Sequence, residues 1–174
     1  MTPEDYMRQA LDLAVEASEV REVPVGAVIV KDGEIIGRGR NRTFETKNPL
    51  AHAEMIAMTE ALENIGGWRL VDCDMYVTLE PCSMCAGAIV HSRLRKVYIG
   101  TPDSKAGACG SVLDITGEKR LNHQPEIEIG ILQPECERIL KEFFKKLRGK
   151  KGGTEDEKNR EYFDTIASDS DAFL

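Results

Sequence analysis

Four residues combine side-chain types and spacings that suit a metal centre: His52, Glu54, Cys82 and Cys85. Cys82 and Cys85 are three positions apart, so on a helix both thiols face the same side and can bind one ion. Pro81 comes directly before them and favours the first turn of a helix, where free N–H groups stabilise thiolates. His52 and Glu54 are two positions apart, so both can face one metal only where a helix begins.

One nitrogen and two sulfur ligands suit tetrahedral zinc and leave the fourth position open for water. The residue types therefore predict zinc held by His52, Cys82 and Cys85, with one ion per subunit. Glu54 is not needed as a ligand, and a carboxylate beside a metal-bound water can act as a proton shuttle. Together the residues predict a hydrolytic zinc enzyme with Glu54 as its catalytic residue.

A structural zinc site is the main alternative, with a fourth ligand from Cys73, Cys109 or His91. Structural sites usually show four ligands in recognisable pairs, which these residues do not form. A redox role for the two paired cysteines would leave the neighbouring histidine and glutamate without a purpose. The unpaired cysteines are therefore predicted to be packing residues.

Composition indicates one soluble domain followed by an acidic tail. The chain has 174 residues, of which 41% are hydrophobic and 30% charged, and this is enough for one domain with a core. Residues 152–174 contain seven acidic and two basic residues, a charge of −5, so residues 1–151 account for only −2 of the total −7. We expect a domain over 1–151 and a flexible tail over 152–174.

The cysteine content, the N-terminal segment and the lengths of the apolar runs indicate where the protein is located. The five cysteines are an odd number, and acidic residues interrupt the N-terminal segment, which does not read as a signal peptide. No apolar run is long enough for a membrane span. The predicted location is therefore the cytoplasm.

Hydrophobic periodicity predicts an α/β layered domain, since a helix and a hairpin are followed by strands that alternate with helices. The hairpin turn is Asp32-Gly33, a dipeptide preferred in two-residue turns. Helices are expected over 3–19, 51–64, 81–93 and 135–148. Strands are expected over 23–31, 34–42, 74–79, 96–100 and 126–132.

The metal-ligand segments are similar to the signature of the cytidine and deoxycytidylate deaminase superfamily. They read His52-Ala53-Glu54 and Pro81-Cys82-Ser83-Met84-Cys85. Over roughly residues 3–150 the chain resembles more specifically the bacterial tRNA-specific adenosine deaminases. The stretches that carry this resemblance include Arg21-Glu22-Val23-Pro24-Val25-Gly26, Asn48-Pro49-Leu50-Ala51, Tyr76-Val77-Thr78-Leu79-Glu80 and His91-Ser92-Arg93.

The resemblance implies a three-layer α/β/α fold whose five-stranded mixed sheet has the order 2-1-3-4-5. It also implies that zinc-bound hydroxide attacks C6 of a flipped adenine while Glu54 moves the protons, so that inosine remains. The implied substrate is the wobble adenosine of an arginine tRNA anticodon. The implied assembly is a homodimer that contacts the anticodon stem-loop from both subunits.

Substrate contacts also follow from the resemblance, residue by residue. Asn41 and the backbone N–H of Ala53 match groups that place the base, and Asp103 matches a sugar contact. Phe144 and Arg148 match terminal-helix residues that receive the anticodon loop.

Simpler roles remain open for some of these side chains. Asn41 could only shape a turn, and Phe143 fits the core stripe of its helix, whereas Phe144 is expected at the surface.

Basic residues form three clusters that could bind phosphates near the site and along the last helix, although such clusters are often only solvated faces. We also expect the acidic tail to screen this basic surface and weaken non-specific RNA binding. The clusters are Arg38, Arg40, Arg42 and Lys47; Arg93, Arg95 and Lys96; and Lys141, Lys145, Lys146, Arg148, Lys150 and Lys151.

Two other functions remain possible at this stage. A deaminase of free guanine or cytosine, or of their nucleosides, would use the same metal site but would gain nothing from the basic terminal helix. A non-catalytic RNA-binding partner of a second deaminase subunit would have no reason to retain Glu54.

Overall fold

The computed structural model describes residues 1–149 and 159–168. Its helices are α1 (Pro3–Glu19), α2 (Thr43–Thr46), α3 (Ala53–Ile65), α4 (Ser83–Ser92), α5 (Gln133–Gly149) and α7 (Arg160–Ser168). Its strands are β1 (Gly26–Lys31), β2 (Glu34–Arg40), β3 (Asp74–Leu79), β4 (Lys96–Thr101) and β5 (Glu126–Ile129).

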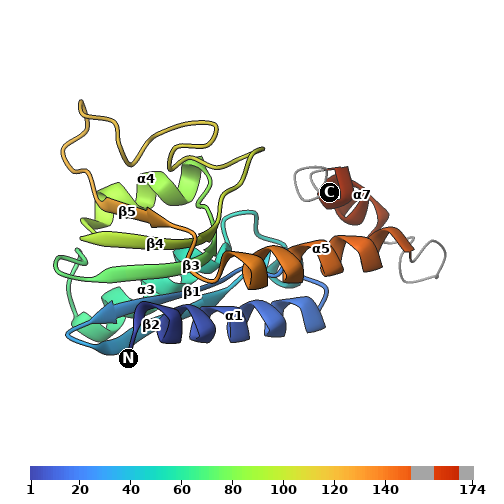
Figure 1. The fold of residues 1–174 in the computed structure, drawn as a ribbon, viewed down its shortest axis with the longest axis horizontal. Coiled ribbons are helices and arrows are strands. Elements are labelled where there is room, and N and C mark those ends of the chain that lie inside the picture. Colours follow the sequence, from blue (N-terminus) through green and yellow to red (C-terminus); the bar gives the residue numbers. More distant parts are fainter. Residues whose placement is uncertain (150–158, 169–174) are drawn as a thin grey trace.

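The five strands form one mixed sheet in the order β2-β1-β3-β4-β5, as the resemblance implied (Figure 1). The β1–β2 hairpin and the β1–β3 pair are antiparallel, whereas β3, β4 and β5 run parallel. The parallel strands are connected through helices or long segments, so their carboxyl ends lie together at one edge. Ligands of α/β sheets commonly bind at this edge.

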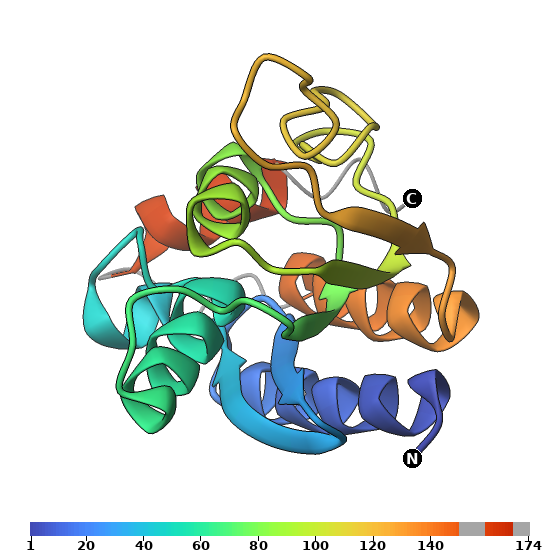
Figure 2. The ribbon, with the colours of Figure 1, turned by 90° about the vertical axis from the view of Figure 1, so that its left-hand side faces the viewer.

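Helices cover both faces of the sheet, which confirms the predicted three layers (Figure 2). Helices α3 and α4 cover one face, and α1 and α5 cover the other. Successive residues of β1 point to opposite faces, as the pleat of a strand requires: Ala27 and Ile29 join the α3/α4 side, and Val28 and Val30 join the α1 side. Both faces of the sheet are therefore buried.

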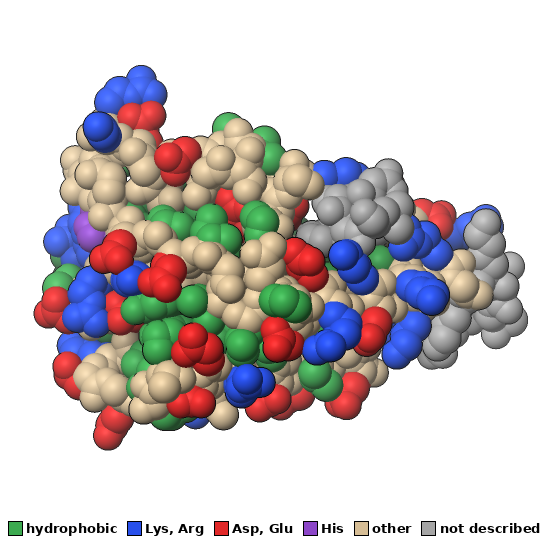
Figure 3. All heavy atoms as spheres, in the orientation of Figure 1, with side chains coloured by type: hydrophobic (Ala, Val, Ile, Leu, Met, Phe, Trp, Pro, Cys, Tyr) green, Lys and Arg blue, Asp and Glu red, His purple; other side chains and the backbone are tan. Residues whose placement is uncertain are grey.

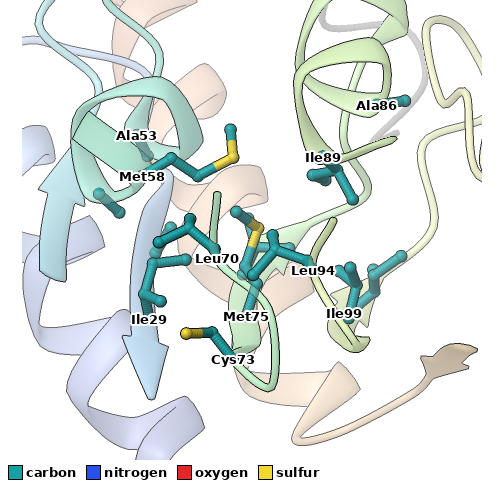
Figure 4. Packing of buried hydrophobic residues seen from close by; sticks show 14 of the residues in the cluster. Ile29, Ala53, Met58, Leu70, Cys73, Met75, Ala86, Ile89, Leu94 and Ile99 are labelled. Carbon is teal, nitrogen blue, oxygen red and sulfur yellow. The ribbon is translucent and has the colours of Figure 1, made fainter. Parts of the chain in front are cut away.

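The larger core lies between the sheet and the α3/α4 layer (Figure 4). Met58 of α3 and Ile89 of α4 point into it, together with Met75 and Ile99 from the sheet. These side chains fasten both helices to adjacent strands, so the first turns of α3 and α4 are set on a rigid base.

Helix α3 lies unusually close to β2 because two glycines of β2 face it. A Cβ on Gly39 would lie 2.1 Å from the carbonyl oxygen of Ala53, and one on Gly37 would lie 2.2 Å from that of Ala57. No real side chain tolerates such distances, so only glycine permits this approach. It sets the first turn of α3 against the end of β2, where Asn41 follows.

The element predictions were mostly accurate, with differences at the ends. The last strand stops at Ile129 and not at 132, and α5 begins at Gln133. The short helix α2 lies in a segment expected to be a loop. Among the described residues, no helix has the length and apolar character needed to span a membrane.

Part of the tail, which was predicted to be flexible, is helical in the structure, and its flexibility stays a prediction. Residues 160–168 form α7, and Phe163 of this helix is buried. Its aromatic residues lie three and four positions from Ile166, which places all of them on one helical face. The other tail residues, 152–158 and 169–174, lie outside the described residues, and the domain boundary at 151/152 stays a prediction.

Candidate metal centre

The two halves of the predicted site meet because each stands directly before a helix. His52 is the N-cap of α3 and Cys82 is the N-cap of α4, and both have extended backbone conformations. Cys85 lies in the first turn of α4 and Glu54 in the first turn of α3. The helix starts face one another at the edge where β3 ends.

The distances between the three predicted ligands match those of a tetrahedral zinc site. The Nδ1 atom of His52 lies 3.6 Å from the Sγ of Cys82 and 3.6 Å from the Sγ of Cys85. Zinc bonds of about 2.0–2.1 Å to nitrogen and 2.3 Å to sulfur, at tetrahedral angles, separate the two atoms by about 3.6 Å. All three ligand atoms lie within 4.8 Å of one another, so the residues present fit zinc.

The structural-zinc alternative is not supported. Within residues 1–149 and 159–168, no fourth His, Cys, Asp or Glu joins the ligand cluster. His91 lies at the far end of α4 from Cys82 and is exposed. A three-ligand site leaves one coordination position for water or substrate, as catalytic zinc sites do.

Glu54 lies beside the ligands in a buried position. Only 4% of its surface is exposed, and burial raises the pKa of its carboxyl group to about 7, although the nearby His52 lowers it in part. A carboxyl group whose pKa is close to neutrality can both accept and donate a proton at working pH. This is the property that the proton-shuttle prediction requires.

A hydrogen bond between the two thiols shifts their pKa values in opposite directions. A hydrogen bond from Cys85 lowers the pKa of Cys82 to about 4, and the same bond together with burial raises the pKa of Cys85. A hydrogen bond with Cys82 also raises the pKa of His52.

Zinc binding should release protons at pH 7, because ligands bind metal only when deprotonated. The raised pKa values of Cys85 and His52 make these two groups the main sources of the protons, whereas the lowered pKa of Cys82 makes it a smaller source. Zinc affinity should accordingly rise with pH. Calorimetric titration of the zinc-free protein in buffers of different ionisation enthalpy measures the number of protons released, and binding without proton release would contradict these pKa shifts.

Asn41 connects the end of β2 to the start of α3. Its Oδ1 accepts a hydrogen bond of 2.9 Å from the backbone N–H of Ala53, which caps the helix. This bond leaves the Nδ2 group as the donor of the side chain. Sequence reasoning proposed a turn role or a substrate role for Asn41, and the observed bond fixes its position beside the metal ligands.

Asp103 begins a loop that follows β4 at the same edge of the sheet. The Asp103 side chain is 9% exposed, and its Oδ1 accepts hydrogen bonds from the backbone N–H groups of Lys105 and Ala106. These bonds stabilise a turn, so Asp103 has a structural role here, and its contact with a sugar stays a prediction.

This geometry agrees with a match to a family model. Residues 1–101, more than half of the chain, match the zinc-binding region of cytidine and deoxycytidylate deaminases. The chain belongs to this deaminase family. It is accordingly a zinc-dependent enzyme whose metal ligands are expected in the cluster described above.

The chain is similar to proteins named tRNA-specific adenosine deaminase. It is 47% identical to the tRNA-specific adenosine deaminase of Bacillus subtilis over 84% of this chain and 91% of the relative. It is 46% identical to the protein of the same name from Haemophilus influenzae, over 85% and 86% of the two chains.

Two solved structures are also similar to the deaminase. One comes from a study of tRNA:A34 deaminases, with 43% identity, a TM-score of 0.76, and coverage of 78% of this chain and 99% of that chain. The other is guanine deaminase from Bacillus subtilis, with 39% identity, a TM-score of 0.58, and coverage of 60% and 67%.

Glu80 is a residue whose role sequence reasoning missed. It follows β3, is 2% exposed, and accepts hydrogen bonds from the backbone N–H groups of Asp103, Cys109 and Ser111. The hydroxyl of Ser111 donates a further bond to it. Glu80 lies two positions before Cys82 in the sequence. Its buried side chain thus holds the loop that carries Asp103. The sequence signal that could have indicated this role is the position of an acidic residue between an apolar strand and a predicted metal ligand.

Glutamine in place of Glu80 should lower the free energy of unfolding by about 1–3 kcal/mol, because an amide NH₂ cannot accept the bonds made by the replaced oxygen. We also expect KM to rise more than kcat falls, since the loop carries Asp103. Urea unfolding and steady-state kinetics measure both effects. Glu118→Gln is the control, because Glu118 is a partly exposed residue of the following loop that pairs with Arg120. Equal results for both variants would refute this role.

The expected exposure of Phe144 is wrong. Phe144 is 3% exposed and its ring packs edge-on against Phe143 at 5.3 Å between centroids, so both are buried. They form a cluster with Leu140, against which Ile166 of α7 packs. The hydrophobic periodicity of α5 could not reveal that α7 also packs on this helix. Arg148 is exposed near the end of α5, as a substrate contact requires.

The first basic cluster flanks the site, but two of its members are paired. Arg40 and Arg42 lie on either side of Asn41, and both form ion pairs with Glu45, at 3.2 and 3.0 Å.

The second basic cluster lies away from the site, contrary to the prediction. Lys96 begins β4 in register with Asp74, which begins β3, whereas Cys82 follows the opposite end of β3. Arg95 pairs with Asp74, and Lys96 pairs with acidic residues of β5. This cluster therefore supports the sheet and is not placed to contact a substrate at the metal.

The third basic cluster lines α5, where Lys and Arg side chains gather on the surface (Figure 3). Lys141, Lys145, Lys146 and Arg148 are exposed there, and Lys150 and Lys151 lie outside the described residues.

Proposed function

We propose that this deaminase converts adenosine to inosine at the wobble position of an arginine tRNA anticodon. The observation that carries the proposal is the combination of a three-ligand metal cluster and a buried Glu54 in a chain 46–47% identical to proteins named tRNA-specific adenosine deaminase. The cluster supports hydrolytic chemistry, and the relatives support the substrate.

Zinc held by His52, Cys82 and Cys85 would supply an activated water for attack on the purine. Glu54 would take one proton from that water and deliver it to the ring, and would then carry the remaining hydroxyl proton to the exocyclic amino group, which leaves as ammonia. Its burial keeps bulk water from competing for the proton. Its pKa of about 7 suits both directions of transfer.

The proposed substrate contacts come from Asn41, Ala53, Asp103 and the end of α5. Asn41 is held by Ala53, so its Nδ2 group can donate a hydrogen bond to a base that enters the site. The backbone N–H of Ala53 is engaged by this bond, and its own contact with the base remains a proposal. Asp103 lies on the loop opposite and is proposed to meet the sugar. The C-terminal part of α5, with Phe144 and Arg148, is proposed to receive the anticodon loop.

A homodimer that binds one anticodon stem-loop per site is part of the proposal, as is a cytoplasmic location, where tRNA is modified. Analytical ultracentrifugation at micromolar concentration tests the assembly. A sedimentation coefficient of a monomer over the whole range would reject the dimer.

The decisive experiment is inosine formation in a transcribed arginine tRNA with an ACG anticodon. Free adenosine, cytidine and guanine serve as parallel substrates, and the same tRNA with a wobble guanosine serves as the control. Inosine at the wobble position alone supports the proposal. Turnover of a free base alone would overturn it but keep the metal chemistry.

Guanine deamination is the second candidate, because a guanine deaminase is 39% identical to this chain over 60% of its length. The match covers less of both chains than the match to the tRNA:A34 deaminase structure. Conversion of guanine to xanthine, followed by absorbance, distinguishes this candidate in the same set of reactions.

A further inference from the structure

Helix α7 is packed against the body through an aromatic contact surface. The ring of Tyr162 stacks on Phe44 of α2, with 4.8 Å between centroids and an interplanar angle of 27°. The guanidinium carbon of Arg21 lies 4.1 Å from the ring centroid of Phe163. Stacking and cation–π contacts of this kind stabilise docking beyond the buried area alone. Helix α7 therefore has a defined seat on the molecule.

Hydrogen bonds hold α7 at both ends. The hydroxyl groups of Tyr162 and Thr43 lie 3.2 Å apart, and the Nζ of Lys105 donates a bond of 2.6 Å to the carbonyl oxygen of Ser168. Tyr162 and Ser168 are about 9 Å apart along the helix, at 1.5 Å per residue. The helix thus bridges the α2 segment and the loop after β4.

These two segments are the ones that carry the proposed substrate contacts. Thr43 lies two positions after Asn41, and Lys105 lies two positions after Asp103. In Figure 1, α7 lies at the end of the molecule where β5 leads into α5, which is also the end where β3 leads to the metal ligands. Helix α7 therefore contacts the two segments that carry the proposed substrate contacts, at the end of the molecule where the parallel strands end.

The surface under α7 includes a proposed RNA contact. Ile166 packs on the cluster of Leu140, Phe143 and Phe144, and Phe144 is only 3% exposed. An RNA base cannot stack on a buried ring, so contact between Phe144 and the anticodon loop requires that this cover moves away. RNA and α7 therefore compete for the same surface.

We propose that α7 is an autoinhibitory cover of the RNA-binding surface, which a polyanionic RNA stem-loop must displace before its adenosine reaches the metal. The proposal rests on the proposed tRNA function. It adds that the free enzyme exists mainly in a covered state, so its apparent affinity for RNA is lower than that of the uncovered surface.

The test compares two substitutions on the same helix. Phe163→Ala removes a contact residue of α7 and should release the helix, whereas Thr165→Ala changes an exposed position and is the matched control. For an anticodon stem-loop substrate, Phe163→Ala should lower KM by about tenfold with an unchanged kcat, because only the covered fraction changes. The control should behave as the unmodified chain does.

Hydrogen exchange measured on the full chain provides the second readout. Amides of 160–168 should be protected in the free protein, and either the RNA stem-loop or Phe163→Ala should remove that protection. An unchanged KM in a variant with an unprotected α7 would overturn the proposal, and a raised KM would show that α7 is part of the binding surface instead.

The experiments distinguish failure of the proposed tRNA function from failure of the proposal for α7. If neither the unmodified chain nor Phe163→Ala deaminates the stem-loop, the tRNA function is wrong and the cover proposal falls with it. If the unmodified chain deaminates the RNA and protection of 160–168 persists in the complex, only the cover proposal is wrong.

Discussion

Glutamine in place of Glu54 should slow deamination by about 10²–10⁴-fold in kcat, the usual contribution of a general acid–base residue. Glutamine keeps the size and the buried position of the side chain but cannot accept and return a proton. Zinc content should stay near one ion per chain, because Glu54 is not in the ligand cluster of His52, Cys82 and Cys85. Single-turnover kinetics and metal analysis measure the two quantities on the same preparation.

Glu63→Gln is the matched control for this substitution. Glu63 lies on the same helix, α3, but is exposed, so the variant carries the same chemical change away from the site. Its kcat should equal that of the unmodified chain. A Glu54→Gln variant that retains zinc and full turnover would show that another group moves the protons.

The metal ligands could be predicted from the sequence because their geometry is local. Cys82 and Cys85 are three positions apart at the start of one helix, and His52 stands at the start of another. Helix starts were marked by prolines and by the periodicity of the residues that follow. The strand order that brings the two helix starts to one edge of the sheet was implied by the family resemblance. The structure has this strand order.

The surroundings of the site could not be predicted, because they depend on contacts between distant segments. Glu80 meets the loop of Ser111 more than thirty positions later, and Phe44 meets Tyr162 across 118 positions. A buried glutamate after a strand carries no periodic signal of its own, and the helical spacing of Tyr162, Phe163 and Ile166 is too short a pattern to reveal a packed helix in an acidic tail. Such residues acquire a role only when the fold brings their partners to them.

The exposure of Phe144 shows the same limit on one helix. The 3.6-residue period correctly predicted a buried stripe on α5 that includes Phe143, and it placed Phe144 outside that stripe. Helix α7 adds a second layer over this side of α5, where Ile166 packs on the cluster of Phe144. The hydrophobic periodicity of a helix shows which of its faces is apolar, but it does not show which other elements pack on that helix.

Alanine in place of Cys85 should have the largest effect of all, since it removes a ligand and not a proton carrier. Two remaining ligands should bind zinc more than about 100-fold more weakly, because even loss of a residue that only supports a ligand costs 10–100-fold. Deamination should then fall at least as far as in Glu54→Gln. Metal analysis after dialysis and an activity assay with added zinc measure this loss.

Cys73→Ala separates loss of the metal from loss of a buried thiol. Cys73 and Cys85 are both fully buried, but Cys73 precedes the start of β3, at the opposite end of that strand from the ligands. Its variant should lose stability by packing alone, keep its zinc, and keep its turnover. Because zinc binds the folded state, a chelator should lower the Tm of the unmodified chain and of Cys73→Ala, but not that of Cys85→Ala. Full zinc occupancy in Cys85→Ala would mean that the ion is held elsewhere, and the three-ligand centre would have to be abandoned.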